Sequence, residues 1–299
     1  MKHRLTIGIP VFNGAQFITE ALDSILAQTF DNFAVVISDN ASTDETESIC
    51  KAYAERDHRI RYFREAINRG AAWNYNRVFE LAKTPYFKWA AHDDICAPTF
   101  FERCIETLDQ NPQAALVYPR TTIIDKDSQF VRHYLDELDF FDYSLCKRYR
   151  SYMRLYRKPR SCNPVFGLMR RDILAQTPLI GSFVASDMIL LAELILRGHI
   201  IEIPEYLFLR RDHDNVSIRA YPSYRDRIAW FDPNKKGRLQ LSRWRWLYEY
   251  HQSLQSVSMS VLERLCCHAY LAEWAAWNTP GLVKDTIRAI LWPLLKNRL

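Results

Sequence analysis

Short apolar segments alternate with stretches of helical periodicity through the first third of the chain. The β-prone segment 5–11 is followed by an Asn-Gly turn and then by apolar residues at helical spacing from Phe17 to Leu26. The segment 33–38 is continuously apolar, as strands buried on both faces of a parallel sheet are, and it stops at Asp39. Segments 60–63 and 86–91 repeat the pattern. Strands alternating with helices predict an α/β fold, a Rossmann-like and mostly parallel sheet flanked by helices.

Local signals place the helices between these strands. Ser42 and Glu45 have the spacing of a capping box, which predicts that the second helix begins there. A third helix should follow the turn at 68–70, and Pro98 should begin a fourth. The alternation fades after residue 118. We therefore expect subdomains at 1–118 and 119–220, and a C-terminal helical extension at 221–299, where tryptophan, arginine and helix-forming residues are frequent.

Bulk composition excludes several classes of protein. With 299 residues, 48% of them hydrophobic, the chain can bury a large core, and a net charge of +5 is too mild to indicate nucleic-acid binding. No apolar run approaches the roughly 18 residues that span a bilayer, and the first residues do not resemble a signal peptide. Seven scattered cysteines suggest neither a disulfide framework nor a zinc site. We expect a cytoplasmic protein.

Polar side chains gather where the predicted strands end. In open α/β sheets the ligand lies beyond the carboxyl ends of the strands, so we expect a binding site at this edge. The polar residues at the strand ends are Asn13, Asp39, Asn68, Asp93 and Asp94.

Four motifs, in order and in spacing, resemble those of family 2 of the GT-A fold glycosyltransferases. They are 10–14 (PVFNG), 38–46 (SDNASTDET), 68–70 (NRG) and 92–94 (HDD), and the resemblance continues through 185–187 (ASD) and 211–217 (RDHDNVS). It covers roughly residues 4 to 218. Departures are Asn40 and Ala41, where the family usually has an acidic residue and a glycine, and Ser186, where an acidic residue often precedes the base.

This resemblance implies that the first subdomain binds a nucleotide-sugar donor. Asp39 would accept the N3–H of a uracil or thymine ring, and Pro10 to Phe12 would form the wall behind the base. Asn68 and Gly70 would also contact the donor. From the residues alone, Asp39 could equally be a capping or turn aspartate.

The resemblance also implies a divalent metal, Mn²⁺ or Mg²⁺, bound to the donor diphosphate. Asp94 would ligate the metal, and Asp93 would contact the ribose or the waters of the metal. His213 would add a ligand or a phosphate contact, and Arg211 would pair with a phosphate oxygen. The alternatives are a solvated Asp-Asp turn and an ordinary surface histidine.

Asp187 matches the position of the catalytic base of the family, in the subdomain expected to bind the acceptor. It would take the proton of the acceptor hydroxyl during a single displacement that inverts the anomeric configuration. In isolation, it would be an acidic residue favoured in the first turn of a helix.

Two further segments have open interpretations. Basic residues alternate with tyrosines from Lys147 to Arg160, which indicates a solvated helix face, a lid over a phosphate-bearing or membrane-proximal acceptor, or, with least weight, nucleic-acid binding. The tail carries an apolar stripe from Val283 to Leu295 edged by cations, with a kink expected at Pro293. It is typical of core packing, of a homodimer seam, or of peripheral contact with the inner face of a membrane.

Taken together, the motifs predict an inverting glycosyltransferase that moves a sugar from a UDP- or dTDP-linked donor to a hydroxyl of a glycan or lipid-linked acceptor. One alternative is a catalytically inactive nucleotide-sugar or glycan-binding protein of the same fold. A nucleotidyltransferase is less favoured, because the loop after the first strand lacks a glycine-rich phosphate-binding pattern with a basic residue. No nucleic-acid partner is expected.

Overall fold

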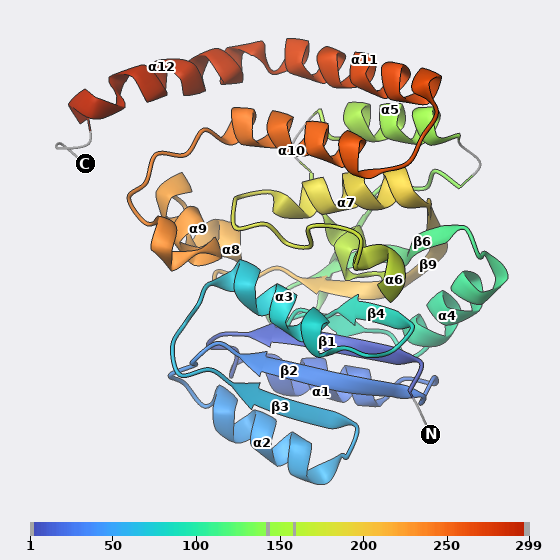
Figure 1. The fold of residues 1–299 in the computed structure, drawn as a ribbon. Coiled ribbons are helices and arrows are strands. Elements are labelled where there is room, and N and C mark those ends of the chain that lie inside the picture. Colours follow the sequence, from blue (N-terminus) through green and yellow to red (C-terminus); the bar gives the residue numbers. More distant parts are fainter. Residues whose placement is uncertain (1–2, 142–143, 158–159, 296–299) are drawn as a thin grey trace.

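The computed structural model describes residues 3–141, 144–157 and 160–295 (Figure 1). Its strands form one sheet in the order β3-β2-β1-β4-β8-β6-β9-β5, and β7 pairs with β6. Buried apolar side chains form two clusters, one over each face of the sheet. This architecture confirms the predicted fold class, an α/β sheet flanked by helices with further helices at the C-terminal end.

The first half of the sheet is parallel. β1 pairs with β2 on one side and with β4 on the other, and all seven residues of β1 are buried. The strand order therefore reverses between β1 and β4, which is where open α/β sheets bind ligands. The elements of this half are β1 (Leu5–Val11), α1 (Ile18–Leu26), β2 (Phe33–Asp39), α2 (Thr46–Arg56), β3 (Ile60–Arg64), α3 (Ala71–Leu81) and β4 (Tyr86–Trp89).

The predicted capping box at the start of α2 is wrong. The helix begins at Thr46, and the Ser42 hydroxyl instead accepts from the backbone N–H of Asn13, at 2.9 Å. Asp44 accepts from the backbone N–H of Thr46, at 3.1 Å. The polar residues of this loop therefore connect it to the loop after β1, and Asp44 also accepts from the first residue of the helix.

The second half of the sheet is mixed. β8 runs antiparallel to both β4 and β6, whereas β6 and β9 are parallel. The predicted boundary at residue 118 lies inside β6, so the first two proposed subdomains share one continuous sheet. The helix expected at Pro98 begins two residues later. These elements are β5 (Ile95–Cys96), α4 (Phe100–Gln110), β6 (Ala114–Ile124), β7 (Phe130–Tyr134), β8 (Leu168–Arg170) and β9 (His199–Arg211).

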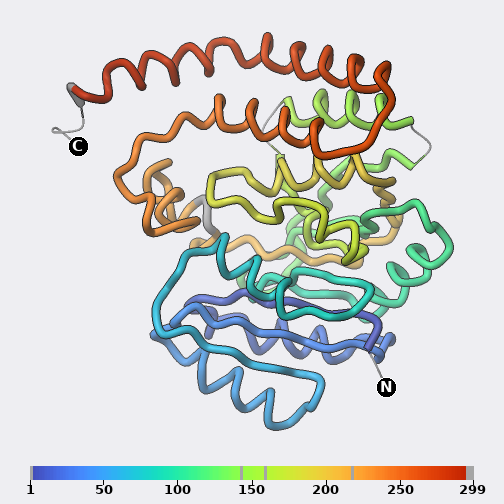
Figure 2. The backbone as a smooth tube through the Cα atoms, in the orientation of Figure 1, coloured from blue at the N-terminus to red at the C-terminus, as the bar shows by residue number. Residues whose placement is uncertain are grey.

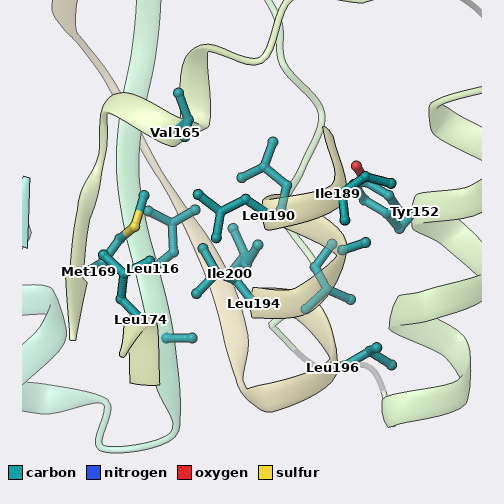
Figure 3. Close-up of a cluster of buried hydrophobic side chains, with 14 of the residues drawn as sticks. Leu116, Tyr152, Val165, Met169, Leu174, Ile189, Leu190, Leu194, Leu196 and Ile200 are labelled. Carbon is teal, nitrogen blue, oxygen red and sulfur yellow. The ribbon is translucent and has the colours of Figure 1, made fainter. Parts of the chain in front are cut away.

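α7 (Ser186–Arg197) is the most deeply buried helix of the second half. It is apolar on nearly all sides because it packs against the sheet as well as against α5 (Leu145–Leu155). Figure 3 shows Leu190 and Leu194 near Ile200 of the sheet, with Ile189 beside Tyr152 of α5. Packing on several sides fixes the position of the first turn of α7. The short elements η1 (Asn163–Phe166) and α6 (Arg171–Leu174) lie between α5 and α7 in the chain.

The C-terminal part is helical, as predicted. After β9 the chain returns to lie beside α3, which Figure 2 shows in orange next to teal. It then builds layers outside α7. No helix in the described part of the chain has the length and apolarity needed to cross a bilayer. These elements are α8 (Ser217–Ala220), α9 (Tyr224–Phe231), η2 (Pro233–Lys235), α10 (Ser242–Ser256), α11 (Val261–Trp277) and α12 (Thr279–Leu295).

The basic and tyrosine-rich run around α5 divides into two faces. Tyr149 and Tyr152 are buried in the core, whereas Lys147, Arg150 and Arg154 are exposed on the opposite side. The cations lie along α11 and not over the carboxyl ends of the strands. Of the three interpretations, the solvated helix face agrees with this arrangement, and a lid over the site does not. Two residues of the run, 158 and 159, lie outside the described residues.

Candidate active site

A cavity of about 400 Å³ lies at the carboxyl ends of β1 and β2, beside the reversal of strand order. Its walls come from the end of β1, from the turn before α3 and from the segment after β9. Pro10, Phe12 and Asn68, expected to contact the donor, all line it. The full lining is Pro10, Val11, Phe12, Asn40, Asn68, Ala71, Asn74, Tyr75, His92, Ala220, Tyr221, Asp226, Ala229, Trp230, Pro233 and Lys236.

Asp39, expected to accept a hydrogen bond from the base, is not among the residues that line the cavity. Its side chain is fully buried, and both carboxylate oxygens accept hydrogen bonds within the protein. One accepts from the backbone N–H of Ser42 at 2.8 Å and the other from the hydroxyl of Tyr62 at 2.6 Å, with Arg64 3.7 Å away. In this geometry both oxygens of Asp39 stabilise the corner after β2.

We expect Asp39→Asn to act on stability. The amide nitrogen of asparagine must face one of the two donors that the carboxylate accepts from, so the free energy of unfolding should fall by about 1–3 kcal/mol. Urea unfolding measures this loss, with Tyr62→Phe as the matched variant that removes one donor from the same carboxylate. If Asp39→Asn has parental stability but no longer binds UDP, Asp39 binds the base after all.

Asn40 and Asn68 together hold the turn before α3. The amide nitrogen of Asn40 donates to the side-chain oxygen of Asn68 at 2.9 Å, and its oxygen accepts from the backbone N–H of Arg69, also at 2.9 Å. The Asn68 oxygen also accepts from the backbone N–H of Gly70 at 2.8 Å. An aspartate at position 40 could not make the first of these bonds. Asn40, which departs from the family pattern, is therefore accommodated by its hydrogen bond to Asn68.

Gly70 is required by conformation and by space, and it does not line the cavity. Its φ is +90°, a region that other residues adopt at a cost. A Cβ at this position would lie 2.5 Å from the backbone oxygen of Phe231 and 2.7 Å from Pro233. The expected donor contact is therefore indirect, because Gly70 lets the segment around Pro233 close against the turn.

Asp93 and Asp94 follow β4 and are both directed into the protein. Burial, followed by the charge of Asp93, raises the pKa of Asp94 to about 7. One oxygen of Asp94 accepts from the backbone N–H of Arg211 at 2.9 Å. Burial also opposes ionisation of Asp93, but nearby His92 and His213 hold the pKa of Asp93 below its ordinary value. The pair concentrates negative charge in a place where a cation would relieve it.

His213 is hydrogen-bonded to Asp93, with 2.9 Å between Nε2 and the carboxylate. Its Nδ1 accepts from the backbone N–H of Asn215 at 3.3 Å, so Nε2 carries the proton and donates to Asp93. Phe17 packs against the ring, with centroids 4.7 Å apart. A metal bound to His213 would have to replace one of these two hydrogen bonds.

The arrangement suits a metal held jointly with a diphosphate. In the described part of the chain, no three His, Cys, Asp or Glu side chains are grouped as a metal cage. Mg²⁺ is commonly bound through one or two carboxylates together with the phosphates of the substrate, which does not require a cage. The buried pair Asp93 and Asp94, with the raised pKa of Asp94, meets that requirement.

Arg211, expected to pair with a phosphate oxygen, donates hydrogen bonds to several parts of the protein and acts as a structural anchor. The guanidinium is 2% exposed, and each of its nitrogens donates within the protein. Nε donates to the Asp93 carbonyl at 2.9 Å, and one terminal nitrogen pairs with Glu20 of α1 at 2.5 Å. The other terminal nitrogen donates to the carbonyls of Asp125 and Lys126 and to the Ser128 hydroxyl.

Asp187 lies in the first turn of α7, where one of its oxygens accepts from the backbone N–H of Met188 at 2.9 Å. The residue that precedes the helix, Ala185, has a φ of +65°, so the chain turns sharply into it. Burial raises the pKa of Asp187, and the bond from Met188 offsets part of the rise. A half-buried carboxyl with a raised pKa is suited to proton transfer near neutral pH.

Tyr75 and Arg210 each interact electrostatically with Asp187 and with the Asp93–Asp94 pair or one of its members. The sequence pattern predicted a role for neither. Burial first, then the charges of Asp93 and Asp94, raise the pKa of Tyr75, and the charge of Asp187 adds to the rise. Arg210 lowers the pKa of both Asp94 and Asp187, and it donates to the Ser161 hydroxyl at 2.8 Å. Tyr75 also lines the cavity, so the three carboxylates act on a residue of the cavity wall, although none of the three lines the cavity itself.

The segment 220–236 closes the cavity, although the sequence pattern placed most of it in a separate helical extension. It contributes the aromatic side chains of Tyr221 and Trp230, whose rings lie 5.9 Å apart, and the cation Lys236. The only sequence feature that could have indicated this role is the presence of aromatic and basic residues at irregular spacing in the segment. They have no periodicity, so helical patterning could not assign them.

Comparison with known proteins shows which family the chain matches. Residues 6–177, more than half of the chain, match the family model described as Glycosyl transferase family 2. The chain is 38% identical over 133 residues to an uncharacterised glycosyltransferase of Rickettsia bellii, and 32% identical over 113 residues to the glycosyltransferase GlyG of Streptococcus pneumoniae. These matches cover 43% and 38% of this chain. They span 19% and 36% of the two relatives, so the chain matches only a minor part of each.

Solved structures share the fold at low sequence identity. Residues 1–349 of TarS of S. aureus, in complex with UDP-GlcNAc, align with a TM-score of 0.57 and 14% identity, covering 96% of this chain and 91% of that one. The mannosyltransferase PcManGT of Pyrobaculum calidifontis, in complex with GDP-Man and Mn²⁺, aligns with a TM-score of 0.53 and 18% identity, covering 97% and 88%.

Proposed function

Because this chain belongs to glycosyl transferase family 2, we propose that it transfers a sugar from a nucleoside-diphosphate donor to a hydroxyl of a glycan or lipid-linked acceptor, by metal-dependent single displacement with inversion. The observation that carries the proposal is that three carboxylates act on one residue of the cavity wall, Tyr75. Asp93 and Asp94 come from the end of β4, and Asp187 comes from the start of α7. Tyr75, a residue of the cavity wall, lies in the field of all three.

The cavity walls orient the donor. Pro10 and Phe12 offer apolar surface to a planar base, and the Asn40–Asn68 pair supplies polar edges beside it. Lys236, exposed on the opposite wall, places a positive charge where a diphosphate needs one. Asp39 is not among the residues that line the cavity, where the carboxylate is that of Asp226. The base preference rests on the amide and aromatic groups of the wall.

The aspartates divide the chemistry between them. Asp93 and Asp94 would hold Mn²⁺ or Mg²⁺, which when bound stabilises the departing nucleoside diphosphate as a Lewis acid. Asp187 would accept the proton of the acceptor hydroxyl as the oxygen attacks the anomeric carbon. Arg210, between Asp187 and Asp94, limits the rise in pKa of both carboxyls. Attack on the face opposite the departing diphosphate would invert the configuration.

A panel of UDP-, dTDP- and GDP-sugars with Mn²⁺ tests this proposal. We expect metal-dependent binding of one nucleotide class, turnover of its sugar, and a product whose anomeric configuration is inverted when read by NMR. Both UDP and GDP belong in the panel because structural neighbours bind one or the other. Binding without hydrolysis or transfer would identify a binding protein. Retention of configuration would exclude single displacement.

A further inference from the structure

The outer surface of the two last helices is apolar along its whole length. In Figure 1, α11 and α12 lie end to end along the top of the molecule, outside α5 and α10. Between 42% and 75% of each of six apolar side chains on these helices is exposed. They are Leu262, Leu265, Val283, Ile287, Ile290 and Leu291.

Helical spacing places these residues opposite the protein core. On α12 the exposed residues from Val283 to Leu291 follow the spacing i, i+4, i+7 and i+8, whereas Leu282 and Asp285 are buried on the other side. On α11 the outward positions after Leu265 are filled by exposed alanines at 269, 272 and 276, and the buried positions include Leu271. Each helix therefore has one face for the core and a second apolar face directed away from it. The side chains of residues 294 and 295 lie outside the description.

Cations border this apolar surface on two sides. Along one side Arg150 lies over the ring of Tyr270, with 5.3 Å from its guanidinium carbon to the ring centroid, and Arg157 lies over Trp277 at 4.5 Å. On the other side Lys284 and Arg288 are exposed on α12. α5, α11 and α12 carry seven Lys or Arg against three Asp or Glu, a net charge of +4, while the whole chain has +5.

We propose that the outer face of α11 and α12, bordered by the cations of α5 and α12, binds to the surface of an anionic lipid bilayer. Apolar side chains edged by Lys and Arg are the pattern of helices that lie in a bilayer interface, with the cations at the phosphate level. A second copy of the chain is disfavoured by charge. A two-fold dimer would bring the exposed cations Arg150, Lys284 and Arg288 of one copy near those of the other, and like charges brought together oppose association.

Co-sedimentation of the full chain with vesicles tests this surface. Vesicles of phosphatidylcholine mixed with phosphatidylglycerol should retain the protein, phosphatidylcholine alone should retain much less, and salt should weaken the retention. The double variants Leu262→Glu/Leu265→Glu and Ile287→Glu/Ile290→Glu should each lower the bound fraction at least about tenfold, because each places two charges at the apolar level of the interface. Val131→Glu, at an exposed apolar position of β7, is the matched control and should bind like the parent.

Further measurements separate a failed fold from a failed proposal. The melting temperature and UDP affinity of each variant should equal those of the parent. The milder pair Arg150→Gln/Lys284→Gln, which leaves the apolar residues in place, should reduce binding to anionic vesicles alone. Equal vesicle binding by parent and variants would overturn the proposal. So would a concentration-dependent dimer in analytical ultracentrifugation that the same variants dissociate while vesicles bind nothing, because the surface would then be a seam between copies.

Discussion

Asp187→Asn should slow sugar transfer by at least about a hundredfold while leaving UDP and metal binding unchanged. A sugar hydroxyl is a poor nucleophile at neutral pH, and a positioned base contributes about 10²–10⁴-fold. Asparagine keeps the size of the side chain and its oxygen can still accept from the backbone N–H of Met188, so the first turn of α7 is preserved. It lacks the proton affinity of the carboxylate. The loss should therefore appear in kcat and not in donor affinity.

The pH profile gives an independent signature of the base. Burial raises the pKa of Asp187, and only its ionised form accepts a proton, so kcat of the parent should fall as pH drops through that raised pKa. This acidic limb should be missing from the residual activity of Asp187→Asn. Asp212→Asn is the matched control, because Asp212 is an exposed acid near the site that pairs with Arg219. If Asp212→Asn loses activity and Asp187→Asn does not, the assignment of the base to Asp187 is wrong.

Asp94→Asn should lower turnover on the order of a hundredfold or more, because metal assistance to the leaving group is worth several kcal/mol. Asparagine is a sharper test than alanine. The oxygen of Asp94 accepts from the buried backbone N–H of Arg211, and alanine would leave this group unpaired at a cost of about 1–3 kcal/mol. The thermal stabilisation that UDP plus Mn²⁺ gives the parent should be lost in the variant.

Without metal, Asp94→Asn should be at least as stable as the parent above neutral pH. The pKa of Asp94 is about 7 in the folded protein against an ordinary value of 3.8, so ionisation of Asp94 disfavours folding. The free energy of unfolding of the parent then falls as pH rises between these two values. Asp127→Asn, at an exposed aspartate, should change neither stability nor turnover. Turnover by Asp94→Asn within about threefold of the parent would contradict the proposal that Asp94 binds the metal.

Periodicity made the first half of the fold predictable. Segments such as 33–38 are buried on both faces of the sheet, so a continuous apolar run was enough to predict a strand there. The capping box failed because Ser42 has a competing partner in the backbone of Asn13, from a different loop. The boundary expected at residue 118 falls inside β6, whose pairing with β9 joins residues far apart in the chain, and local patterning carries no information on that pairing.

Position along the chain predicted which residues gather at the site. It did not predict which of them have a polar atom that is not already hydrogen-bonded within the protein. Asp39 and Arg211 are at the expected strand ends, yet all their polar atoms are engaged by partners such as Tyr62 and Glu20. Tyr75 and Arg210 gave no motif signal, because a tyrosine in a helix and an arginine in a strand are ordinary core and surface residues. Their roles depend on distances to the carboxylates, which only the fold supplies.

The anchor formed by Arg211 bears on the order in which the molecule is made. Its ion pair with Glu20 joins residues 191 positions apart, and its remaining bonds hold the Asp93 carbonyl and the 125–128 loop. A chain emerging from the ribosome can complete the parallel strands β1 to β4 early, because their contacts are closer in sequence. The loop that carries the aspartates can be locked only after Arg211 has been synthesised. Catalytic competence should therefore be acquired well after the parallel strands β1 to β4 have formed.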